Sequence, residues 1–454
     1  MPNKVKFNDN YPSIVKSDEY YKKALNLIPC VTQTLAKGPG QNVKGVAPKY
    51  LQRGQGSYVW DVDGNEYIDF QMGIGPISLG YCYPAVDEAI LEQLRNGITF
   101  SLMHPLEVEV AELINSIVPN AENIRYSKTG ADITSAAVRL ARAYTGREKV
   151  LCCGYHGWHD WYISVTDRNK GIPEATKDLT YTFNYNDIQS VEESIDQDTA
   201  CVILEPFVFD APKDNFLQKL REVCTRYGTL LIFDEMWTGF RVSLGGAQEY
   251  FKVDADLACF SKAVANGMPI GILTGKRDIM KLLEKDVFFF TTFGGEALSL
   301  AAAKATIQEL KKNNVPGYLE SIGGTIKSGL TQIISELRMD YVKCLGFECR
   351  TIVSFDPSAG NPLEMKSFVQ QEFIKRGILW GGFHNLSFSH SESDITYLLN
   401  AYKEVLPLLK IAVDEKNVLK YMRGEVVEPV FRKTSNFNMK PKNNTHRKNI
   451  NAYK

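Results

Sequence analysis

The stretch at 230–241, LLIFDEMWTGFR, places an acidic pair directly after a short apolar run, and this arrangement decides the fold class. Other apolar runs of four to seven residues, such as KVLCCG at 149–154 and ACVILEP at 200–206, alternate with stretches of helical spacing. Short apolar strands separated by helices are typical of a parallel sheet covered on both faces. The pattern therefore predicts an α/β protein whose large domain has a mostly parallel central sheet flanked by helices.

The sequence on either side of this region predicts a smaller α+β domain. The segment at 56–70, GSYVWDVDGNEYIDF, alternates apolar and polar residues around an Asp-Gly turn, which indicates a β-hairpin. Strands are expected within 345–355, and a final helix at 391–413 opens with a Ser-x-x-Asp cap. We expect an N-terminal arm at 1–27, a small α+β domain from 28–75 and 310–429, a large domain at 76–309, and a basic tail at 430–454 that is disordered or surface-draped.

Composition and charge exclude several classes of protein. The 454 residues include 52 Lys and Arg against 53 Asp and Glu, so the protein has no overall positive potential that would bind a nucleic acid. No run of about 18 apolar residues predicts a membrane span, and the polar first residues do not resemble a signal peptide. The nine cysteines form no CxxC pair and no zinc spacing. We expect a cytoplasmic enzyme that acts on small molecules and has no metal, nucleic-acid or membrane partner.

Two strand ends carry candidate reactive groups. Asp234 ends the run LLIFD, where it could hold a metal, act as a base, pair with a protonated ring nitrogen, or simply cap the strand. Lys262 follows a second short apolar run in ADLACFSKAVANGMPIG, at 255–271. A lysine among apolar neighbours is a candidate amine nucleophile that forms Schiff bases, although most lysines are solvated surface charges.

Two further segments suggest the kind of ligand. At 127–146, SKTGADITSAAVRLARAYTG, a turn of small residues opens a helix, and a helix start presents N–H groups and a positive dipole end to a phosphate. At 154–162, GYHGWHDWY, Tyr155 could stack on a planar ring. His156 and His159 have a spacing that a metal pair could use, but no third ligand is in view. Together with Asp234 and Lys262, these features predict a site for a phosphorylated aromatic aldehyde, pyridoxal 5'-phosphate (PLP).

The same blocks resemble a known family, the class III, fold type I PLP-dependent aminotransferases, and within it most closely the glutamate-1-semialdehyde 2,1-aminomutases. The resemblance covers about residues 28–410. It rests on GSYVWDVDGNEYIDF, GIGPISLGYCYPAV, ARAYTGREKV, GYHGWHD, DEMWTGFRVSLGGAQEYF, FSKAVANGMPIG and TTFGGEALSLAAA, which stand in the family's order.

The resemblance implies a role for each residue around the cofactor ring. Lys262 matches the catalytic lysine, which forms the Schiff base with the cofactor and then moves the proton between substrate and cofactor. Asp234 matches the carboxylate that keeps the pyridine nitrogen protonated. Met236 would pack beneath the ring, where the family usually has a smaller aliphatic residue, and Tyr155 would stack on its other face.

The resemblance also implies a phosphate site and a dimer. Thr129, Gly130 and Ala131 match the phosphate-binding turn, although the family commonly reads Ser-Gly-Thr-Glu there and this chain loses one hydroxyl. Thr292 matches a threonine that reaches the phosphate of the neighbouring subunit's cofactor, which implies a homodimer. Glu205 and Arg241 are weaker candidates for substrate binding, and for Arg241 a structural ion pair is the alternative.

Residues outside the cofactor shell bear on the reaction. In the aminomutases an N-terminal arginine binds the substrate carboxylate, whereas this chain reads IPCVTQTLAKG at 28–38, with Ala36 or Lys37 nearest that position. The aromatic residue that precedes Gly-Pro in the aminomutase pattern is also replaced here, by the small aliphatic residues of MGIGPIS around Ile74. These departures favour an aminotransferase with a keto or aldehyde acceptor, for instance sugar-like or phosphorylated. An aminomutase is the alternative, and a PLP-fold binding or regulatory protein is the non-enzyme alternative.

Overall fold

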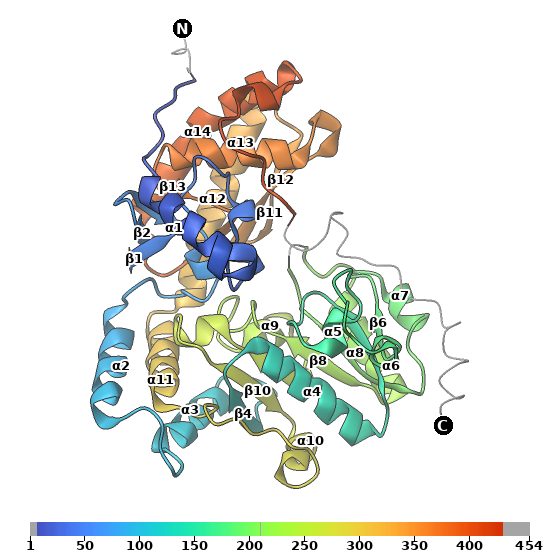
Figure 1. The fold of residues 1–454 in the computed structure, drawn as a ribbon. Coiled ribbons are helices and arrows are strands. Elements are labelled where there is room, and N and C mark those ends of the chain that lie inside the picture. The colour runs from blue at the N-terminus through green and yellow to red at the C-terminus, as the bar shows by residue number, and fades with distance from the viewer. Residues whose placement is uncertain (1–6, 209, 430–454) are drawn as a thin grey trace. The chain divides into compact units, whose positions relative to one another are not determined.

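The computed structural model describes residues 7–208 and 210–429, which form two compact units (Figure 1). We call residues 84–316 the central unit, and residues 7–83 together with 317–429 the terminal unit. The basic tail predicted at 430–454 lies outside the described residues, as do the first six residues of the predicted arm.

The central unit is built on a seven-stranded sheet. Its strands, in spatial order, are β4 (Asn123–Ser127), β10 (Gly271–Gly275), β9 (Leu257–Phe260), β8 (Leu230–Asp234), β7 (Thr199–Leu204), β5 (Lys149–Cys153) and β6 (Thr180–Thr182). The pairs among β6, β5, β7, β8 and β9 are parallel, whereas β10 runs antiparallel to both of its neighbours. The predicted α/β fold with a mostly parallel sheet is confirmed.

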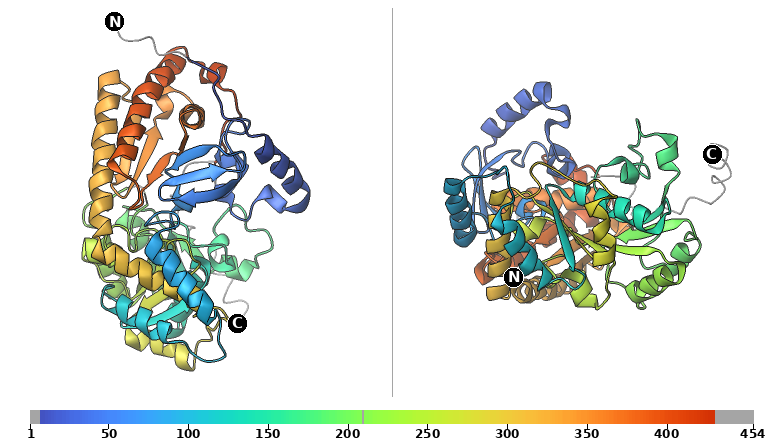
Figure 2. Two further views of the ribbon diagram at one scale, coloured as in Figure 1. Left: turned by 90° about the vertical axis from the view of Figure 1, so that its left-hand side faces the viewer. Right: turned by 90° about the horizontal axis from the view of Figure 1, so that it is seen from below.

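Helices complete the central unit because its strands are apolar on both faces. Every residue of β7, β8 and β9 is buried, so each face of the sheet needs a cover. Helix α4 (Gly130–Thr145) packs its buried side chains, such as Ile133 and Leu140, against alternate residues of the strands, including Ile203 and Ile232. Helices α2 (Pro84–Asn96) and α11 (Ala297–Lys312) lie side by side, as Figures 1 and 2 show. The other helices of this unit are α3 (Pro105–Asn115), α5 (Asp160–Ile163), α6 (Glu174–Lys177), α7 (Ile188–Glu192), α8 (Phe216–Tyr227), α9 (Gly246–Phe251) and α10 (Arg277–Met280).

The terminal unit contains two small sheets. One has the order β1 (Leu51–Gln55), β2 (Tyr58–Asp61), β3 (Glu66–Asp69) and β13 (Ile378–Leu379), and the other β11 (Val342–Phe347), β12 (Arg350–Phe355) and β14 (Phe383–Asn385). Strands β2 and β3 form the predicted hairpin. Its turn is closed by Asp61, whose Oδ1 accepts hydrogen bonds from the backbone N–H groups of Asp63 and Asn65. The parallel pair of β3 with β13 joins the two chain segments of this unit.

Four helices pack on these sheets: α1 (Val15–Leu27), α12 (Val315–Leu337), α13 (Pro362–Ile374) and α14 (Glu392–Asp414). The predicted cap of the last helix is present. Ser391 and Asp394 form a capping box, in which each side chain accepts a hydrogen bond from the other residue's backbone N–H. Helices α13 and α14 lie side by side.

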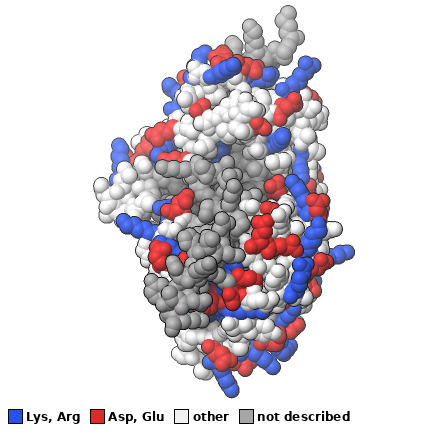
Figure 3. All heavy atoms as spheres, turned by 90° about the vertical axis from the view of Figure 1, so that its right-hand side faces the viewer, with Lys and Arg blue, Asp and Glu red and all other residues white. Residues whose placement is uncertain are grey.

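The surface carries both signs of charge, and Figure 3 shows acidic and basic side chains interspersed over one face. Within residues 7–208 and 210–429, no helix is long and apolar enough to cross a membrane.

Candidate active site

Four parallel strands bring the candidate residues to one edge of the central sheet. Tyr155 and His156 follow β5, Glu205 follows β7, Asp234 ends β8, and Lys262 comes two residues after β9. Because the carboxyl ends of parallel strands meet at the same edge, side chains that are distant in sequence converge there.

Asp234 is held at both carboxylate oxygens and is almost completely buried. Its Oδ1 accepts a hydrogen bond of 3.1 Å from the backbone N–H of Met236, and its Oδ2 lies 2.7 Å from Nδ1 of His156. The other ring nitrogen of His156 lies 3.1 Å from the carbonyl oxygen of Cys153. A carbonyl oxygen can only accept, so this nitrogen carries a proton. His156 thus bridges Asp234 to the Cys153 carbonyl and fixes the position of the carboxylate.

Glu205 adds a second acidic group to this edge. Its Oε1 accepts a 2.7 Å hydrogen bond from the backbone N–H of Tyr155. Burial and the neighbouring charge of Asp234 raise the pKa of Glu205, while the positive charge of Lys262 acts in the opposite direction. Gly154 leaves room for this carboxylate, because a Cβ there would lie 2.8 Å from Oε1. Glu205 therefore lies within electrostatic reach of both Asp234 and Lys262.

Tyr155 is partly exposed, as a residue that stacks on a ligand must be. Its ring packs edge-on against Tyr162, with 5.6 Å between ring centroids. Burial raises the pKa of the Tyr155 hydroxyl, and the charges of Asp234 and Glu205 add to the effect. The ring of Tyr155 thus belongs to the same cluster.

The predicted phosphate turn begins α4. Thr129 is the N-cap residue, and its Oγ1 accepts from the backbone N–H of Asp132, whose carboxylate accepts from the N–H of Thr129. The N–H groups of Gly130 and Ala131 stand in the first turn, where a helix offers them no acceptor. A Cβ on Gly130 would meet Sδ of Met236 at 2.8 Å, so Met236 lies directly against this turn.

Lys262 occupies a conformation that side-chain-bearing residues rarely adopt. It opens a short 3-10 helix at Lys262–Ala265 with a φ of 49°, in the left-handed region. Such backbone strain persists where the surrounding structure imposes it, and it clusters at functional sites. Here the hydroxyl of Ser261 donates a 2.6 Å hydrogen bond to the carbonyl of Ile270 and fixes the chain beside the lysine.

Two further predicted residues, Thr292 and Arg241, have different surroundings. Thr292 is exposed, and within the described part of the chain no interaction joins it to the other candidates. Arg241 is completely buried; its guanidinium lies 4.1 Å from the ring centroid of Trp237, and its Nε donates to the carbonyl of Trp237. This burial favours the structural interpretation of Arg241 over substrate binding.

The contact of His156 with Asp234 was not expected from the sequence, where the spacing of His156 and His159 suggested only a metal pair without a third ligand. The two rings have separate partners: His156 contacts Asp234, while Nδ1 of His159 lies 2.7 Å from the Ser135 hydroxyl. Within the described residues there is no group of three side chains that could hold a metal ion. The available signal was the position of His156 just beyond the end of a parallel strand.

Comparison with known proteins defines the class. A sequence model of the family Aminotransferase class-III matches residues 41–389, and the chain belongs to this family of PLP-dependent enzymes. A 3-aminobutyryl-CoA aminotransferase from Cloacimonas acidaminovorans (strain Evry) is 33% identical over 410 residues, which cover 87% of this chain and 98% of that protein. A glutamate-1-semialdehyde 2,1-aminomutase from Methanocella arvoryzae (strain DSM 22066 / NBRC 105507 / MRE50) is 34% identical over 429 residues, which cover 87% of this chain and 99% of that protein.

Solved structures agree with the family. The FumI protein of Sphingopyxis sp. MTA144, solved as the PLP internal aldimine, has a TM-score of 0.82 and 26% identity, with 90% of this chain and 100% of that chain covered. A glutamate-1-semialdehyde aminomutase from Pseudomonas aeruginosa PAO1 shares the fold, with a TM-score of 0.77, 21% identity and coverage of 87% and 95%. The cofactor of the family is therefore PLP.

The residues present fit this cofactor. The start of α4 offers backbone N–H donors for a phosphate, and the buried Asp234 can accept from a pyridinium N–H. The amine of Lys262 and the aromatic ring of Tyr155 belong to the same sheet edge. A phosphate, a protonated ring nitrogen and an aldehyde thus each have a complementary group.

Proposed function

We propose that this protein is an aminotransferase that moves an amino group between a small-molecule donor and a separate keto or aldehyde acceptor. The observation that carries the proposal is the cluster of Asp234, His156, Glu205 and Lys262 at one sheet edge beside the start of α4. When bound, PLP supplies an aldehyde that exchanges amines and a ring that accepts electrons from the substrate carbon.

Each residue of the cluster has a separate task in this proposal. The Lys262 amine binds the cofactor and then carries the proton to and from the substrate carbon. Asp234, held in place by His156 and the Met236 N–H, keeps the pyridine nitrogen protonated. Thr129, Gly130 and Ala131 hold the phosphate, while Tyr155 and Met236 contact the two faces of the ring. Glu205 orients the Tyr155 backbone through its hydrogen bond.

Transfer between two molecules is favoured over an intramolecular shift by the N-terminal segment. The first arginine of the chain is Arg53, and its guanidinium lies 4.1 Å from the ring centroid of Trp60. Lys37, nearest the position expected for the aminomutase arginine, is an exposed residue of the 3-10 helix Leu35–Lys37. A lysine does not reproduce the two parallel hydrogen bonds that arginine makes to a carboxylate. The similarity to a 3-aminobutyryl-CoA aminotransferase is consistent with a phosphorylated acceptor or donor.

We further propose that the enzyme is a homodimer in which Thr292 contacts the phosphate of the partner subunit's cofactor. The segments at 100–103 and 288–293 carry exposed apolar side chains, among them Met103 at 84% and Phe288 at 74% exposure. A hydrogen bond from the Ala297 N–H to the Ile98 carbonyl joins the chain just before the first segment to the chain just after the second. An exposed apolar surface of this kind marks an interaction site, and a second copy of the chain is the occupant that would also bring Thr292 to a cofactor.

The test is the absorbance of the PLP-loaded protein during titration with a panel of amino donors. One donor should convert the cofactor to its amine form, and a keto or aldehyde acceptor should then restore the original spectrum. Glutamate 1-semialdehyde, added alone, should not be isomerised at a comparable rate. Isomerisation without any donor would identify an aminomutase instead. Binding of PLP without a response to any donor would identify a binding or regulatory protein.

A further inference from the structure

An open cavity of about 470 Å³ lies beside helix α4 in the central unit. Small-molecule sites in proteins have volumes of about 300–1,000 Å³, so the cavity is large enough for a ligand of that kind. One face of α4 forms part of the wall, and the loop before α5, the start of α5 and one residue of α6 complete it. The lining residues are Ser135, Val138, Arg139, Arg142, Trp158, His159, Asp160, Trp161 and Thr176.

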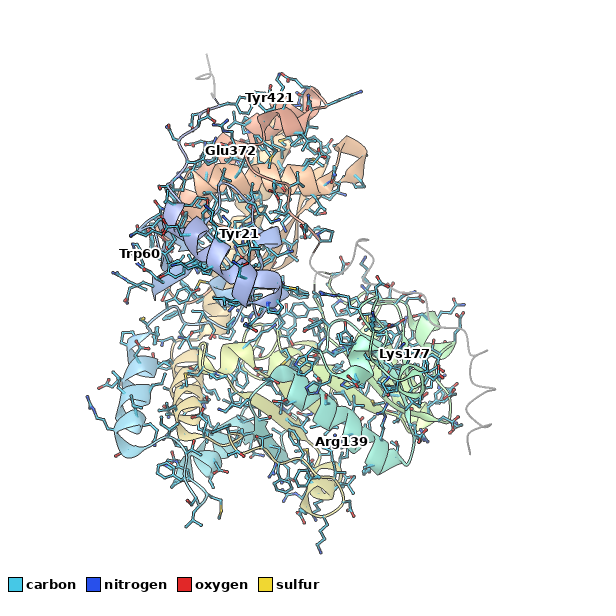
Figure 4. All side chains as sticks on the ribbon, in the orientation of Figure 1. Tyr21, Trp60, Arg139, Lys177, Glu372 and Tyr421 are labelled. Atoms are coloured by element: carbon cyan, nitrogen blue, oxygen red, sulfur yellow. The ribbon has the colours of Figure 1, made fainter. Side chains whose placement is uncertain are left out.

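Two arginines of α4, one helical turn apart, line this cavity. Nη1 of Arg139, which is labelled in Figure 4, donates a 2.9 Å hydrogen bond to the Phe288 carbonyl. Nε of Arg142 donates a 2.8 Å hydrogen bond to the Glu148 carbonyl. The N–H groups on the other guanidinium nitrogens remain available, and within the described part of the chain no carboxylate oxygen lies within 4 Å of either side chain. Two adjacent guanidinium groups suit a phosphate, which accepts hydrogen bonds on several oxygens.

An exposed aromatic ring lines the same cavity. The chain has five tryptophans, and Trp158 is the one that is exposed, at 70%. Its ring stands edge-on to that of His159, with 4.8 Å between the ring centroids and 85° between the planes. The indole therefore has a fixed neighbour on one side and can offer a face to a planar ring.

Hydrogen bonds attach the aromatic side of the cavity to α4. Nε1 of Trp161 donates 3.0 Å to Oγ of Ser135, and Nδ1 of His159 lies 2.7 Å from the same oxygen. The ring against which Trp158 packs is thus held in place before any ligand binds, which reduces the entropy cost of binding. Asp160, the first residue of α5, adds a carboxylate that can accept from hydroxyl groups.

A cavity of the terminal unit differs in its charges. It has a volume of about 550 Å³ and is lined by Lys375 and Arg376, among others. Glu372 accepts from both cations, at 2.7 Å from Lys375 and 3.2 Å from Arg376, and Glu404 lies 2.9 Å from Arg376. The cations of that cavity are already neutralised, whereas those beside α4 are not.

We propose that the cavity beside α4 binds a small molecule that joins a phosphate to a planar ring, the chemistry of a nucleoside monophosphate. Arg139 and Arg142 hold the phosphate, Trp158 stacks on the ring, and Asp160 accepts from the sugar hydroxyls. None of these residues is assigned to the cofactor, and the proposal does not depend on amino transfer.

The experiment is isothermal titration calorimetry on the PLP-loaded protein, dialysed free of excess cofactor so that the phosphate turn at Thr129 is filled. The titrants are the 5'-monophosphates of adenosine, guanosine, cytidine and uridine, each with its nucleoside, and inorganic phosphate. We expect at least one nucleotide to bind at least about tenfold more tightly than both its nucleoside and inorganic phosphate, because the ring and the phosphate each contribute.

Substitutions identify the residues that bind the nucleotide. Trp158→Ala should raise its Kd by at least about tenfold, whereas Trp158→Phe, which keeps an aromatic face, should stay within about threefold. Arg139→Gln and Arg142→Gln should each raise Kd by about tenfold. Arg168→Gln is the matched control, at an exposed arginine that follows the same loop but does not line the cavity, and should leave Kd within about twofold. Circular dichroism checks the fold of every variant.

Three results would overturn the site: no binding of any of the four nucleotides, binding of inorganic phosphate as tight as that of the nucleotides, or an unchanged Kd in Trp158→Ala. Arg139 donates to a carbonyl of the segment 288–293, so sedimentation of Trp158→Ala is measured as well. Dissociation of a dimer in this variant, with no nucleotide binding, would assign the cavity to a second copy of the chain instead. Calorimetry requires no turnover, so a failure here stays distinct from a failure of the proposed function.

Discussion

His156 and His384 are both completely buried, one in each unit of the protein, and their partners differ. Nδ1 of His156 faces a carboxylate oxygen of Asp234, and its other nitrogen faces a carbonyl. The ring of His384 lies between two hydroxyls, those of Thr351 and Tyr402, at 2.8 and 2.9 Å. A hydroxyl can donate or accept, so His384 is satisfied as a neutral ring.

The partner, and not burial, decides what a buried histidine does. Burial lowers the pKa of His384 to about 3, with a smaller contribution from His390. His156 instead fixes the carboxylate of Asp234, which suits a site that must keep a ring nitrogen charged. Substitutions in the central cluster should therefore reduce activity, whereas substitutions around His384 should reduce stability.

The largest effect is expected for Lys262→Ala. Loss of the amine removes both the attachment of the cofactor and the proton carrier, so kcat should fall by at least about 10³-fold. Tm should change little, because the lysine is not part of the apolar core. Single-turnover and steady-state assays, with circular dichroism as the check on folding, measure both. Normal turnover of this variant would refute the assignment.

Asp234→Asn should come next, with kcat lower by about 100-fold, because an amide cannot hold the ring nitrogen protonated. Glu235→Gln is the matched control at the adjacent buried carboxyl. Glu235 accepts from the N–H groups of Ala247 and Gln248 on its two oxygens, so glutamine, which keeps only one acceptor oxygen, should lower Tm while kcat falls much less than in Asp234→Asn. Equal losses in the two variants would show that burial of charge, and not the position of Asp234, matters.

The same substitution at each of the two histidines tests this difference. His156→Phe should lower kcat by about tenfold and shift the pH profile of kcat, since Asp234 loses the partner that orients it. His384→Phe should leave kcat within about twofold. It should lower the free energy of unfolding by about 1–3 kcal/mol, because the hydroxyls of Thr351 and Tyr402 remain buried without their partner. Urea unfolding and pH-dependent kinetics on both variants give the comparison. A stability loss without a kinetic change in His156→Phe would make it purely structural.

The effect that is smallest at neutral pH concerns the pH dependence of stability. The folded pKa values of His384 and His390 are lowered to about 3 and about 4, below the ordinary value of about 6.5 in the unfolded chain. Their contribution is complete above pH 6.5 and is lost as the pH falls, because only the unfolded chain then binds protons. Each should steepen the loss by about 1.4 kcal/mol per pH unit between about pH 6 and pH 4. His384→Gln should remove its share of that slope in urea titrations, and an unchanged slope would contradict the assignment.

Much of the fold was predictable because its signals are local. The apolar run 230–234 became β8, the Asp-Gly turn became the hairpin of β2 and β3, and the Ser391 cap opened α14. Strand order was not predictable from the chain, since β10 lies between β4 and β9 and reverses direction there.

The candidate site, like the fold, could be predicted only where its signals are local in the sequence. Asp234, Lys262 and the turn at Thr129 could be proposed because each stands at the end of a strand or the start of a helix. The pairing of His156 with Asp234 spans 78 residues, and that of Glu205 with the Tyr155 N–H spans 50. Neither contact leaves a spacing in the sequence that could reveal it.

The sequence by itself determined the family, the cofactor and the residues that could react, because these depend on residue type at the ends of local elements. Only the tertiary structure decided that His156 contacts Asp234, that Glu205 accepts from the Tyr155 N–H, and that Arg241 is buried against Trp237. The physical reason is that hydration, charge and hydrogen bonding depend on distance in space. Residues such as His156 and Arg241 acquire their environment only when the chain has folded.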